Sequence, residues 1–481
     1  MALPGRKLIV VSNREPYRLK GGRLERTVGG LAAALDPVMR ASGGVWITSG
    51  VKGRGDISSR IAVPPEDPSY VMRKVPITEE DMDGFYNGYS NRFLWPLCHI
   101  TLDRVRFKRS YWASYGKVNR LFAGAVIDES SGDPAVLLQD YHLAMCALSI
   151  RASLPDALIS LFWHIPWPPY AVFRICPHRR ELLEGLLAND LIGFQLDAFK
   201  TNFIRCAQEE LGARFDPEKD ALLRNGRATV LKTLPVSIDF EWFDSAARSG
   251  EARAFISGFL KDRGLQGATL GISVNRLDYT KGLIKCLDSI EVFFDKYPGY
   301  RGKVVFLHIA VPTRKAEPYK SYRERVRKRV AAINKSLSTG RWRPVEYIDA
   351  DFSHKELAAL YGAARFIIVS SVYDGMNLVA KEYIASQTGL AGCALVSEFA
   401  GSSEDIPGVT PINPYDAEGC ADAINGALTS APAERKRSLR LAREHIRRND
   451  IYKWAGDLLR ELERARWQNI SSRTSKRSKR R

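Results

Sequence analysis

The fold is decided by a short apolar run, TLGISV at residues 269–274, and by the polar turn RLDYTKG at residues 276–282. A brief run rich in β-branched residues is typical of a strand buried on both faces of a parallel sheet. The turn behind it carries two cations, Arg276 and Lys281. Because ligands of open α/β sheets bind beyond the carboxyl ends of the strands, the turn predicts a clamp for an anion such as a diphosphate. The alternative is a solvated surface pair.

Similar apolar runs recur in two series, separated by longer segments with helical spacing. The first series comprises residues 8–12, 45–48, 136–139, 158–163, 191–194 and 229–234, and the second comprises 269–274, 303–309, 345–348, 366–370 and 394–397. Helices between parallel strands form right-handed crossovers. The pattern therefore predicts an α/β protein with two Rossmann-like, doubly wound parallel-sheet domains whose strand ends face a central cleft.

The break between the two predicted domains lies near PVSID at residues 235–239, where a strand ends in proline and a polar turn begins. We expect an N-terminal domain at 1–238 and a C-terminal domain at 239–448. An apolar stripe at helical spacing, which includes Trp454, predicts that residues 449–468 form a helix packing back on the N-terminal domain. Residues 469–481 are expected to be a disordered basic tail, since from residue 471 they contain no apolar side chain.

The net charge of the chain limits the classes of partner that it is expected to bind. The 481 residues include 72 Lys and Arg against 54 Asp and Glu, a formal net charge of +18. Such an excess fits a nucleic acid, an anionic membrane surface or small anionic substrates. The last 48 residues alone hold 17 Lys and Arg against 6 Asp and Glu, so the rest is only mildly basic. The basic tail has no interleaved aromatic residues, and we do not expect a nucleic-acid partner.

Targeting segments and metal-binding patterns are missing from the sequence. No segment is long and apolar enough to be a signal-peptide core or a membrane span, so we expect a cytoplasmic protein with no membrane partner. The seven cysteines stand singly, in no Cys-x-x-Cys pattern, and the histidines lack metal-ligand spacing. The sequence thus predicts buried thiols, no metal site and no bound cofactor.

Polar groups follow several strands of the first series. Arg14 comes after the first strand in SNR at residues 12–14, the pair Gly29-Gly30 opens a helix, DYH at residues 140–142 follows the third strand, and His164 follows the fourth. Carboxyl strand ends place such residues in the predicted cleft. Taken alone, the glycine pair is more readily a plain loop, and a single histidine is more often structural than functional.

Two further strand ends of the second series carry candidate ligand contacts. Arg314 follows the strand at residues 303–309, and DGMNLVAKE at residues 374–382 follows the strand at 366–370. Asn377 can cap the helix that begins there, and the loop amides then point their donors at an anion. Asp374 could accept hydroxyl groups of a sugar and Glu382 those of a ribose. For Glu382 the alternative is a solvated helix charge.

Seven segments, in order along the chain, carry a resemblance to a known enzyme family. They are SNR at 12–14, GGL at 29–31, YN at 86–87 with LWP at 94–96, DYH at 140–142, HIP at 164–166, RLDYTKG at 276–282 and DGMNLVAKE at 374–382. With them the chain resembles the trehalose-6-phosphate synthases, which are retaining nucleotide-sugar glycosyltransferases of the GT-B fold. The resemblance runs from about residue 8 to about residue 467.

The resemblance implies transfer of glucose from UDP-glucose, or another nucleoside diphosphate glucose, to glucose 6-phosphate with retention at the anomeric carbon. The donor-binding residues that it implies are Gly29, Gly30, Arg276, Lys281, Asn377, Leu378, Val379 and Glu382. The catalytic residues that it implies are His164, Arg276, Lys281 and Asp374, of which His164 and Asp374 address the transferred glucose. The acceptor-binding residues that it implies are Arg14, Tyr86, Trp95, Asp140 and Arg314.

Retention without an evident protein nucleophile is a chemical constraint, because a double displacement needs a carboxylate at the anomeric carbon. In the family the favoured picture is front-face substitution, in which a diphosphate oxygen takes the proton of the acceptor hydroxyl. The protein then supplies position and charge stabilisation. Since Arg276 and Lys281 would neutralise the leaving group, the resemblance implies neither a metal nor a cofactor.

Departures from the family pattern bear on the acceptor. Gln139 stands where the family often has His before Asp140, and EPY at residues 15–17 looks more like the glucosylglycerol-phosphate synthases, whose acceptor is glycerol 3-phosphate. Arg314 and YN at residues 86–87 match the trehalose-forming branch, which we favour. A pseudo-glycosyltransferase that joins cyclitols is a further alternative. The donor base and the oligomeric state stay open, and a homo-oligomer is compatible with the sequence.

Overall fold

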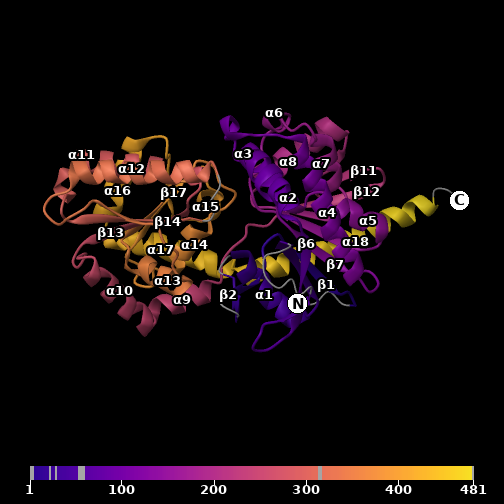
Figure 1. Ribbon diagram of the computed structural model, residues 1–481, viewed down its shortest axis with the longest axis horizontal. Coiled ribbons are helices and arrows are strands. Elements are labelled where there is room, and N and C mark those ends of the chain that lie inside the picture. The colour runs from indigo at the N-terminus through magenta and orange to yellow at the C-terminus, as the bar shows by residue number, and fades with distance from the viewer. Residues whose placement is uncertain (1–4, 21–22, 28–29, 52–59, 313–316, 479–481) are drawn as a thin grey trace. The chain divides into compact units, whose positions relative to one another are not determined.

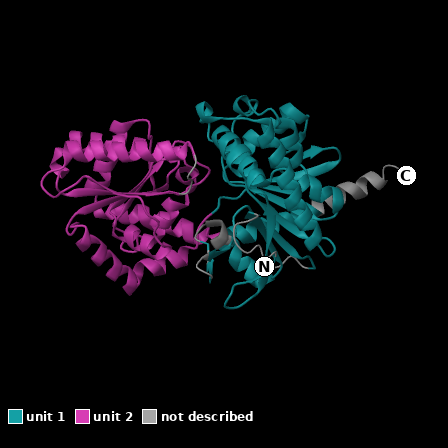
Figure 2. Ribbon diagram, in the orientation of Figure 1, with its two compact units in different colours: residues 1–236, 452–481 teal, residues 237–451 magenta. Residues whose placement is uncertain are grey.

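The computed structural model describes residues 5–20, 23–27, 30–51, 60–312 and 317–478, with side chains except at residues 20, 26, 30–34 and 467–478. The chain divides into two compact units (Figure 2). Unit 1 comprises Met1–Val236 and Tyr452–Arg481, and unit 2 comprises Ser237–Ile451. The boundaries predicted from the sequence lie after residues 238 and 448. Among the described residues, no helix has the length and apolar character that crossing a membrane requires.

Unit 1 is built on one twisted ten-stranded sheet. Its strands, in spatial order, are β10 (Arg214–Asp216), β11 (Ala221–Arg224), β12 (Arg227–Thr233), β9 (Leu191–Phe194), β8 (Leu158–Trp163), β7 (Ala135–Gln139), β1 (Leu8–Val11), β4 (Val45–Val51), β6 (Tyr70–Ile77) and β5 (Arg60–Val63). The strands from β12 to β6 pair in parallel, whereas β5, β10 and β11 pair antiparallel. The parallel core agrees with the predicted doubly wound sheet, and short antiparallel partners extend that core at both edges.

The order of the unit 1 strands reverses between β1 and β7. The chain proceeds from β1 outward through β4 and β6, and then returns to β7 and proceeds the other way. Such a switch point leaves a crevice beyond the carboxyl ends of the two central strands, which is where doubly wound sheets bind ligands. The loops after β1, β7 and β8 therefore have the position expected of a binding site.

Helices and a separate two-stranded hairpin complete unit 1 (Figure 1). The hairpin pairs β2 (Tyr17–Lys20) with β3 (Arg23–Arg26). The helices are α1 (Gly30–Ser42), α2 (Glu79–Met82), α3 (Trp95–Cys98), α4 (Arg109–Glu129), α5 (Cys146–Ser153), α6 (Tyr170–Phe173), α7 (Arg179–Leu186) and α8 (Asp197–Leu211), with a π-helix, η1 (Asp83–Leu94), and two 3₁₀ turns, η2 (Leu102–Arg104) and η3 (Tyr141–Leu143).

The last helix, α18 (Ile451–Ser478), returns to unit 1 (Figure 2). The ring of Trp454 meets that of Phe162 on β8 edge-on, with 5.0 Å between centroids, and its indole N–H donates to the Leu234 carbonyl at 3.1 Å. Buried apolar residues of its first turns thus cover the sheet. The helix continues past residue 469, where the sequence predicts that a disordered tail begins. The side chains of that basic tail lie outside the described part of the chain.

Unit 2 contains a six-stranded sheet in which all neighbours are parallel. Its strands, in spatial order, are β15 (Val345–Ile348), β14 (Val304–Val311), β13 (Thr269–Arg276), β16 (Phe366–Val369), β17 (Cys393–Ser397) and β18 (Thr410–Ile412). The order reverses between β13 and β16, so the loops after these two strands lie at the switch point of this sheet. The predicted doubly wound arrangement is confirmed here.

Helices cover both faces of the unit 2 sheet. Figure 1 shows α11 (Leu283–Lys296), α12 (Tyr319–Leu337) and α16 (Ala417–Thr429) on one face. On the other face lie α9 (Phe240–Arg248), α10 (Gly250–Asp262), α13 (His354–Ala363), α14 (Leu378–Ser386) and α17 (Pro432–Arg448). Shorter elements are α15 (Gly401–Asp405), η4 (Tyr279–Lys281) and η5 (Pro298–Tyr300). Because both faces are covered, strands such as β14 are buried along almost their whole length, as their continuous apolar runs predict.

Candidate active site

In unit 2, the loops that follow β13 and β16 are joined to each other by hydrogen bonds. The amide of Val372 donates to the carbonyl of Thr280 at 2.8 Å. The hydroxyl of Ser370 donates to the carbonyls of Lys281 at 3.0 Å and Gly282 at 3.3 Å. The two loops at the switch point therefore form one unit of structure, which fixes the side chains that they carry.

Gly282 makes this close approach possible. It has a φ of 65°, in the left-handed region, and a Cβ built at this position would overlap the carbonyl oxygen of Ser370. Only glycine combines that φ with the absence of a side chain. The turn before it is held by Asp278, whose carboxylate accepts from the amide and the hydroxyl of Thr280, both at 3.1 Å.

A buried ion pair lies between the two loops. The ammonium of Lys281 donates to Oδ2 of Asp374, and both residues are buried. The same oxygen accepts from the hydroxyl of Ser371 at 3.1 Å and from Nδ2 of Asn377 at 3.3 Å. Three donors on one oxygen satisfy a buried carboxylate, which would be costly to bury alone. The structure thus brings the predicted residues Lys281, Asp374 and Asn377 into one cluster.

Asn377 shapes the beginning of α14. Its side-chain oxygen accepts from the amide of Ala380 at 3.3 Å, which confirms the predicted cap. Its backbone has a φ of 95°, an unusual value for a residue with a side chain. Leu378 and Val379 form the first turn of α14, where helical amides have no partner within the helix and favour an anion. Arg276, half-buried, is the last residue of β13.

Glu382 lies further along α14 in a protected position. Its Oε2 accepts from the hydroxyl of Tyr361 on α13 at 3.2 Å. Burial raises the pKa of this carboxyl to about 7, because desolvation disfavours the charged form more than the Tyr361 hydrogen bond favours it. The side chain therefore differs from the solvated helix charge that the sequence left as an alternative.

In unit 1, His164 is held between two glutamines at the carboxyl ends of β7, β8 and β9. Oε1 of Gln139 lies 3.1 Å from its Nε2, and Nε2 of Gln195 lies 3.5 Å from its Nδ1. The amide of Val236 donates to Oε1 of Gln195 at 2.9 Å, so the Gln195 amino group must face the ring. Nδ1 is then an acceptor, and Nε2 carries the proton that it donates to Gln139.

The same burial keeps His164 neutral. Desolvation lowers the pKa of the imidazole to about 3, and no carboxylate contributes to that shift. At neutral pH this ring can offer a hydrogen bond of fixed direction, but it cannot carry a positive charge.

Asp140 has a strained backbone at the end of β7. Its φ of 74° and ψ of 169° lie in a region that is essentially reserved for glycine. Its Oδ1 accepts from the amides of Tyr141 at 2.9 Å and His164 at 3.2 Å. Strain of this kind persists only where the surroundings enforce it, and it is frequent at binding and active sites. A hydrogen bond thus joins the side chain of Asp140 to the backbone of His164.

Aromatic residues from η1 and α3 lie near the same strand ends. The ring of Tyr86 stacks on that of His142 with 5.6 Å between centroids, and Trp95 lies 4.0 Å from the ring of His99 and 6.1 Å from that of Tyr141. Tyr86 belongs to the π-helix, an irregular form that often marks functional sites. These contacts connect Tyr86 and Trp95 to the loop after β7.

The remaining predicted residues are only partly described. Arg14 is exposed in the loop after β1, whose Ser12 hydroxyl donates to the Arg14 carbonyl at 2.6 Å. Gly30 is the first residue of α1. Gly29 and Arg314 lie outside the described residues.

Sequence reasoning missed three residues that position the predicted ones. Ser371 and Tyr361 donate to Asp374 and Glu382, and Gln195 orients His164. Gln195 directly follows β9, so the rule that polar residues follow strands could have found it. Within the described ranges, no group of three or more His, Cys, Asp and Glu side chains is arranged to hold a metal ion. All seven cysteines are free thiols, and all but Cys393 are buried.

Comparison with known proteins agrees with this geometry. Residues 6–464 match the family model described as Glycosyltransferase family 20. A bifunctional trehalose-6-phosphate synthase/phosphatase of Thermoproteus tenax is 33% identical over 95% of this chain, which spans 63% of that relative's length. A trehalose-6-phosphate synthase of Mycolicibacterium vanbaalenii is 33% identical, and the match covers 95% of this chain and 96% of the relative.

Solved structures extend the comparison to the fold. An α,α-trehalose-phosphate synthase (UDP-forming) of Burkholderia xenovorans, in complex with glucose 6-phosphate, matches with a TM-score of 0.87 and 30% identity over 95% of this chain and 100% of that one. The E. coli trehalose-6-phosphate protein bound with UDP-2-fluoro glucose gives a TM-score of 0.87 and 30% identity, covering 95% and 98%. The two Rossmann-like units are thus those of the GT-B fold, and the chain belongs to glycosyltransferase family 20.

Proposed function

We propose that this chain transfers glucose from UDP-glucose to glucose 6-phosphate, with retention at the anomeric carbon, and forms α,α-trehalose 6-phosphate. Family membership supports a glycosyltransferase. A relative that matches this chain over 96% of its own length is a trehalose-6-phosphate synthase. Solved structures of relatives hold glucose 6-phosphate or a fluorinated UDP-glucose.

The observation that carries the proposal is the Lys281–Asp374–Asn377 cluster at the switch point of unit 2. It combines a cation, a sugar-binding carboxylate and a capped helix N-terminus within two joined loops. A nucleoside diphosphate sugar presents the matching groups, because its diphosphate needs cations and amides and its sugar needs carboxylate acceptors.

We assign the donor contacts to unit 2 on this basis. Arg276 and Lys281 would neutralise the diphosphate, and the amides of Leu378 and Val379 would donate to it. Glu382, beyond the first turn of α14, would accept from the ribose hydroxyls. Lys281 is paired with Asp374, so the diphosphate would share a cation that is already positioned and desolvated.

The bond changes follow from retention. The acceptor hydroxyl oxygen forms a bond to the anomeric carbon on the face from which the diphosphate departs, and the bond between that carbon and the diphosphate oxygen breaks. The hydroxyl proton passes to the departing diphosphate, so UDP leaves as the balanced product. Arg276 and Lys281 stabilise the charge that develops there. We propose that these two cations suffice without a metal.

All of the proposed acceptor contacts except Arg314, which belongs to unit 2, come from residues of unit 1. Arg14, Tyr86 and Arg314 would hold the phosphate of glucose 6-phosphate, while Trp95 and Asp140 would contact its sugar. His164, neutral and of fixed tautomer, would hydrogen-bond the transferred glucose together with Asp374.

Glycerol 3-phosphate is the alternative acceptor, suggested by EPY at residues 15–17. In the structure these residues have structural partners. The hydroxyl of Tyr17 bonds to Asp36 at 3.2 Å, and Glu15 pairs with Lys74 at 2.8 Å. Glu15 and Tyr17 are thus held by contacts within unit 1, so packing accounts for them without glycerol 3-phosphate as the acceptor.

The test is UDP release from UDP-glucose with glucose 6-phosphate and glycerol 3-phosphate in parallel. We expect turnover with glucose 6-phosphate and product with an α,α linkage. Turnover with glycerol 3-phosphate alone would show that glycerol 3-phosphate, and not glucose 6-phosphate, is the acceptor. Inactivity with both would favour a pseudo-glycosyltransferase that joins cyclitols. The Arg276→Ala variant is the control for catalysis at the assigned site. We further propose that the reaction takes place in the cytoplasm.

A further inference from the structure

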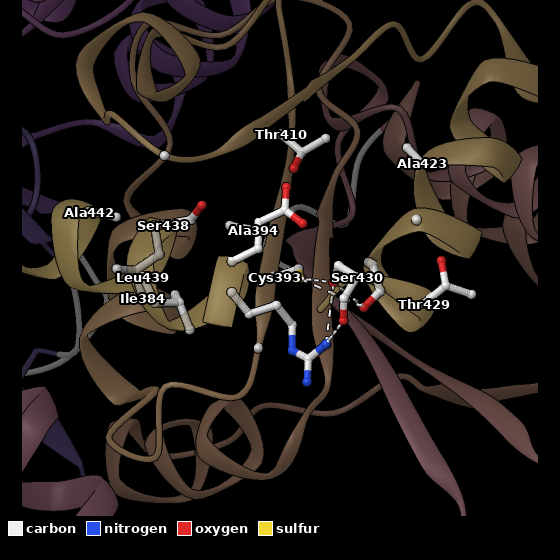
Figure 3. A pocket seen from close by; sticks show the side chains of 16 residues that line it. Ile384, Cys393, Ala394, Thr410, Ala423, Thr429, Ser430, Ser438, Leu439 and Ala442 are labelled. Atoms are coloured by element: carbon white, nitrogen blue, oxygen red, sulfur yellow. Dashed lines mark hydrogen bonds between the residues drawn. The ribbon is translucent and has the colours of Figure 1, made fainter. Parts of the chain in front are cut away.

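Unit 2 contains a cavity of about 410 Å³ that no part of the proposed reaction uses. Its size lies within the usual range of small-molecule sites. Figure 3 shows Ile384, Ser438, Leu439 and Ala442 on one side of it and Ala423, Thr429 and Ser430 on the other, with Cys393 and Ala394 between them. Helices α14 and α17 thus form one wall, and α16 with the loop after it forms the other.

The cavity is separate from the donor loops. Cys393 and Thr410, which line it, are the first residues of β17 and β18. The donor loops follow the carboxyl ends of β13 and β16, and all strands of this sheet run in parallel. The cavity therefore lies at the amino edge of the same sheet, whereas the proposed donor contacts lie at its carboxyl edge.

Arg435, on α17, is an unusual residue in the cavity wall. It is only 9% exposed, and its guanidinium donates through Nη1 to the carbonyl and, at 3.4 Å, to the hydroxyl of Ser430. Its Nε is buried and has no hydrogen-bond partner. Among the residues that the structure describes, no carboxylate forms an ion pair with it. A buried cation of this kind is costly unless an anion accompanies it.

A second guanidinium adds to the positive potential here. Arg365, at the start of β16, has its pKa lowered by burial and by the charge of Arg435. Nη1 of Arg365 donates to the carbonyl of Ala391 at 2.9 Å. Because a carbonyl is neutral, this hydrogen bond does not compensate the charge of Arg365. Arg435 lines the cavity and Arg365 does not, so Arg365 adds to the positive potential around Arg435 without placing a second cation in the cavity wall.

The other lining groups restrict what such an anion can be. Hydroxyl groups of Thr410, Thr429, Ser430 and Ser438 line the cavity together with apolar side chains of Ile384 and Leu439. Glu434 also lines it and is exposed, whereas Arg435 is buried. A ligand with its anionic group inward and hydroxyl groups outward satisfies both.

We propose that this cavity is a binding site for a small hydroxylated anion, whose carboxylate or phosphate group pairs with the buried Arg435. The ligand would contact Ile384 on α14, the helix that also carries Glu382. The site is independent of the proposed reaction, so its test reads binding directly.

The experiment is isothermal titration of the full chain with inorganic phosphate, phosphoglycolate and lactate, which separate the phosphate and carboxylate groups. Arg435→Met removes the cation. Gly426→Leu adds a side chain to the cavity lining and leaves the Arg435 residue unchanged, and an added Cβ at Gly426 meets nothing within 4 Å. Gly426→Ala is its matched control, and thermal unfolding checks that each variant folds.

We expect saturable binding of at least one probe to the wild type and to Gly426→Ala. The dissociation constant should rise tenfold or more in Arg435→Met and in Gly426→Leu. If Arg435→Met fails to fold, the two Gly426 variants decide alone. Binding of equal strength to Gly426→Leu and Gly426→Ala would overturn the proposal, because the anion would then be held elsewhere. The absence of saturable binding of all three probes to the wild type would overturn it as well.

Discussion

The side-chain oxygen of Gln139 lies 3.1 Å from Nε2 of His164, and this contact gives a partner to the residue that departs from the family pattern. Gln139 is fully enclosed at the end of β7, and the Gln195 amide on the other side of the ring leaves Nε2 as the protonated nitrogen. Gln195 thus sets the tautomer, and Gln139 supplies the acceptor for the protonated Nε2 of a histidine that the proposed reaction uses.

Replacing Gln139 with Ala should lower kcat/KM for glucose transfer by about tenfold, because a buried hydrogen bond of about 1–2 kcal/mol that orients His164 is lost. Steady-state UDP release measures this. The matched control is Gln208→Ala, an exposed glutamine on α8. Equal kinetics of the two variants would contradict a positioning role for Gln139.

Glu382 should make donor binding depend on pH. Its pKa is raised to about 7 by burial, so the carboxyl is increasingly protonated as the pH falls below 7. The protonated form loses acceptor capacity for ribose hydroxyls. The dissociation constant of UDP should therefore be about tenfold higher at pH 6 than at pH 8. UDP itself titrates in this range, so the comparison is with Glu382→Gln, whose own profile should be flatter. If the dissociation constants of the wild type and of Glu382→Gln change with pH in the same way, Glu382 does not contact the donor.

Gly282 offers a test of how the two donor loops are joined. Gly282→Ala places a Cβ against the Ser370 carbonyl at a φ of 65°. Gly264, at the end of α10, has a φ of 63° and nothing within 4 Å of an added Cβ. Gly264→Ala should therefore lower the free energy of unfolding by about 1 kcal/mol, the cost of a left-handed conformation for alanine. Gly282→Ala should lower it by about 3 kcal/mol or more, because the clash adds to that cost.

Chemical denaturation of both variants measures the difference in the free energy of unfolding. Gly282→Ala should also weaken UDP binding, since the clash separates the loops that carry Lys281 and Asp374. Similar free energies of unfolding for the two alanine variants would contradict this prediction, because the loops would then move apart without loss of stability.

The sequence predicted the centre of each sheet better than its edges. Buried strands such as β8 and β14 are continuous apolar runs and were found, because both of their faces meet helices. The edge strand β10 consists of Arg, Phe and Asp, and β6, which pairs with the edge strand β5, alternates buried and accessible residues, so neither has an apolar run. Edge strands with one open face carry a weaker signal.

The candidate site shows the same division. Positions after strands, such as His164 and Asp374, follow from the sheet topology, which the sequence fixes locally. Partners such as Tyr361 come from a helix face, and their contact with Glu382 depends on how α13 packs on α14. The strain at Asp140 could not be predicted either, because most aspartates have a negative φ even though Asp is enriched among the exceptions.

Arg276 and Lys281 should differ in their effects although both would face the diphosphate. Arg276→Ala should lower kcat/KM by a factor that corresponds to about 3 kcal/mol of transition-state stabilisation. Lys281→Met should lower it as much and also destabilise the fold by about 3 kcal/mol, since it leaves the Asp374 carboxylate buried without its cation. Kinetics and denaturation of both variants test this. Wild-type turnover by Arg276→Ala would exclude the assigned donor site.

The backbone of Asp140 allows its strain to be measured apart from its side chain. Asp140→Gly and Asp140→Ala both lose the carboxylate that accepts from Tyr141 and His164, so both should lose most activity. They differ only in the Cβ, which is what disfavours a φ of 74° with a ψ of 169°. Alanine is ordinarily the more stable of the two, but here Asp140→Gly should be more stable than Asp140→Ala by about 1–3 kcal/mol. The usual order in thermal unfolding would show that the backbone relaxes, and that the strain does not serve to aim this carboxylate.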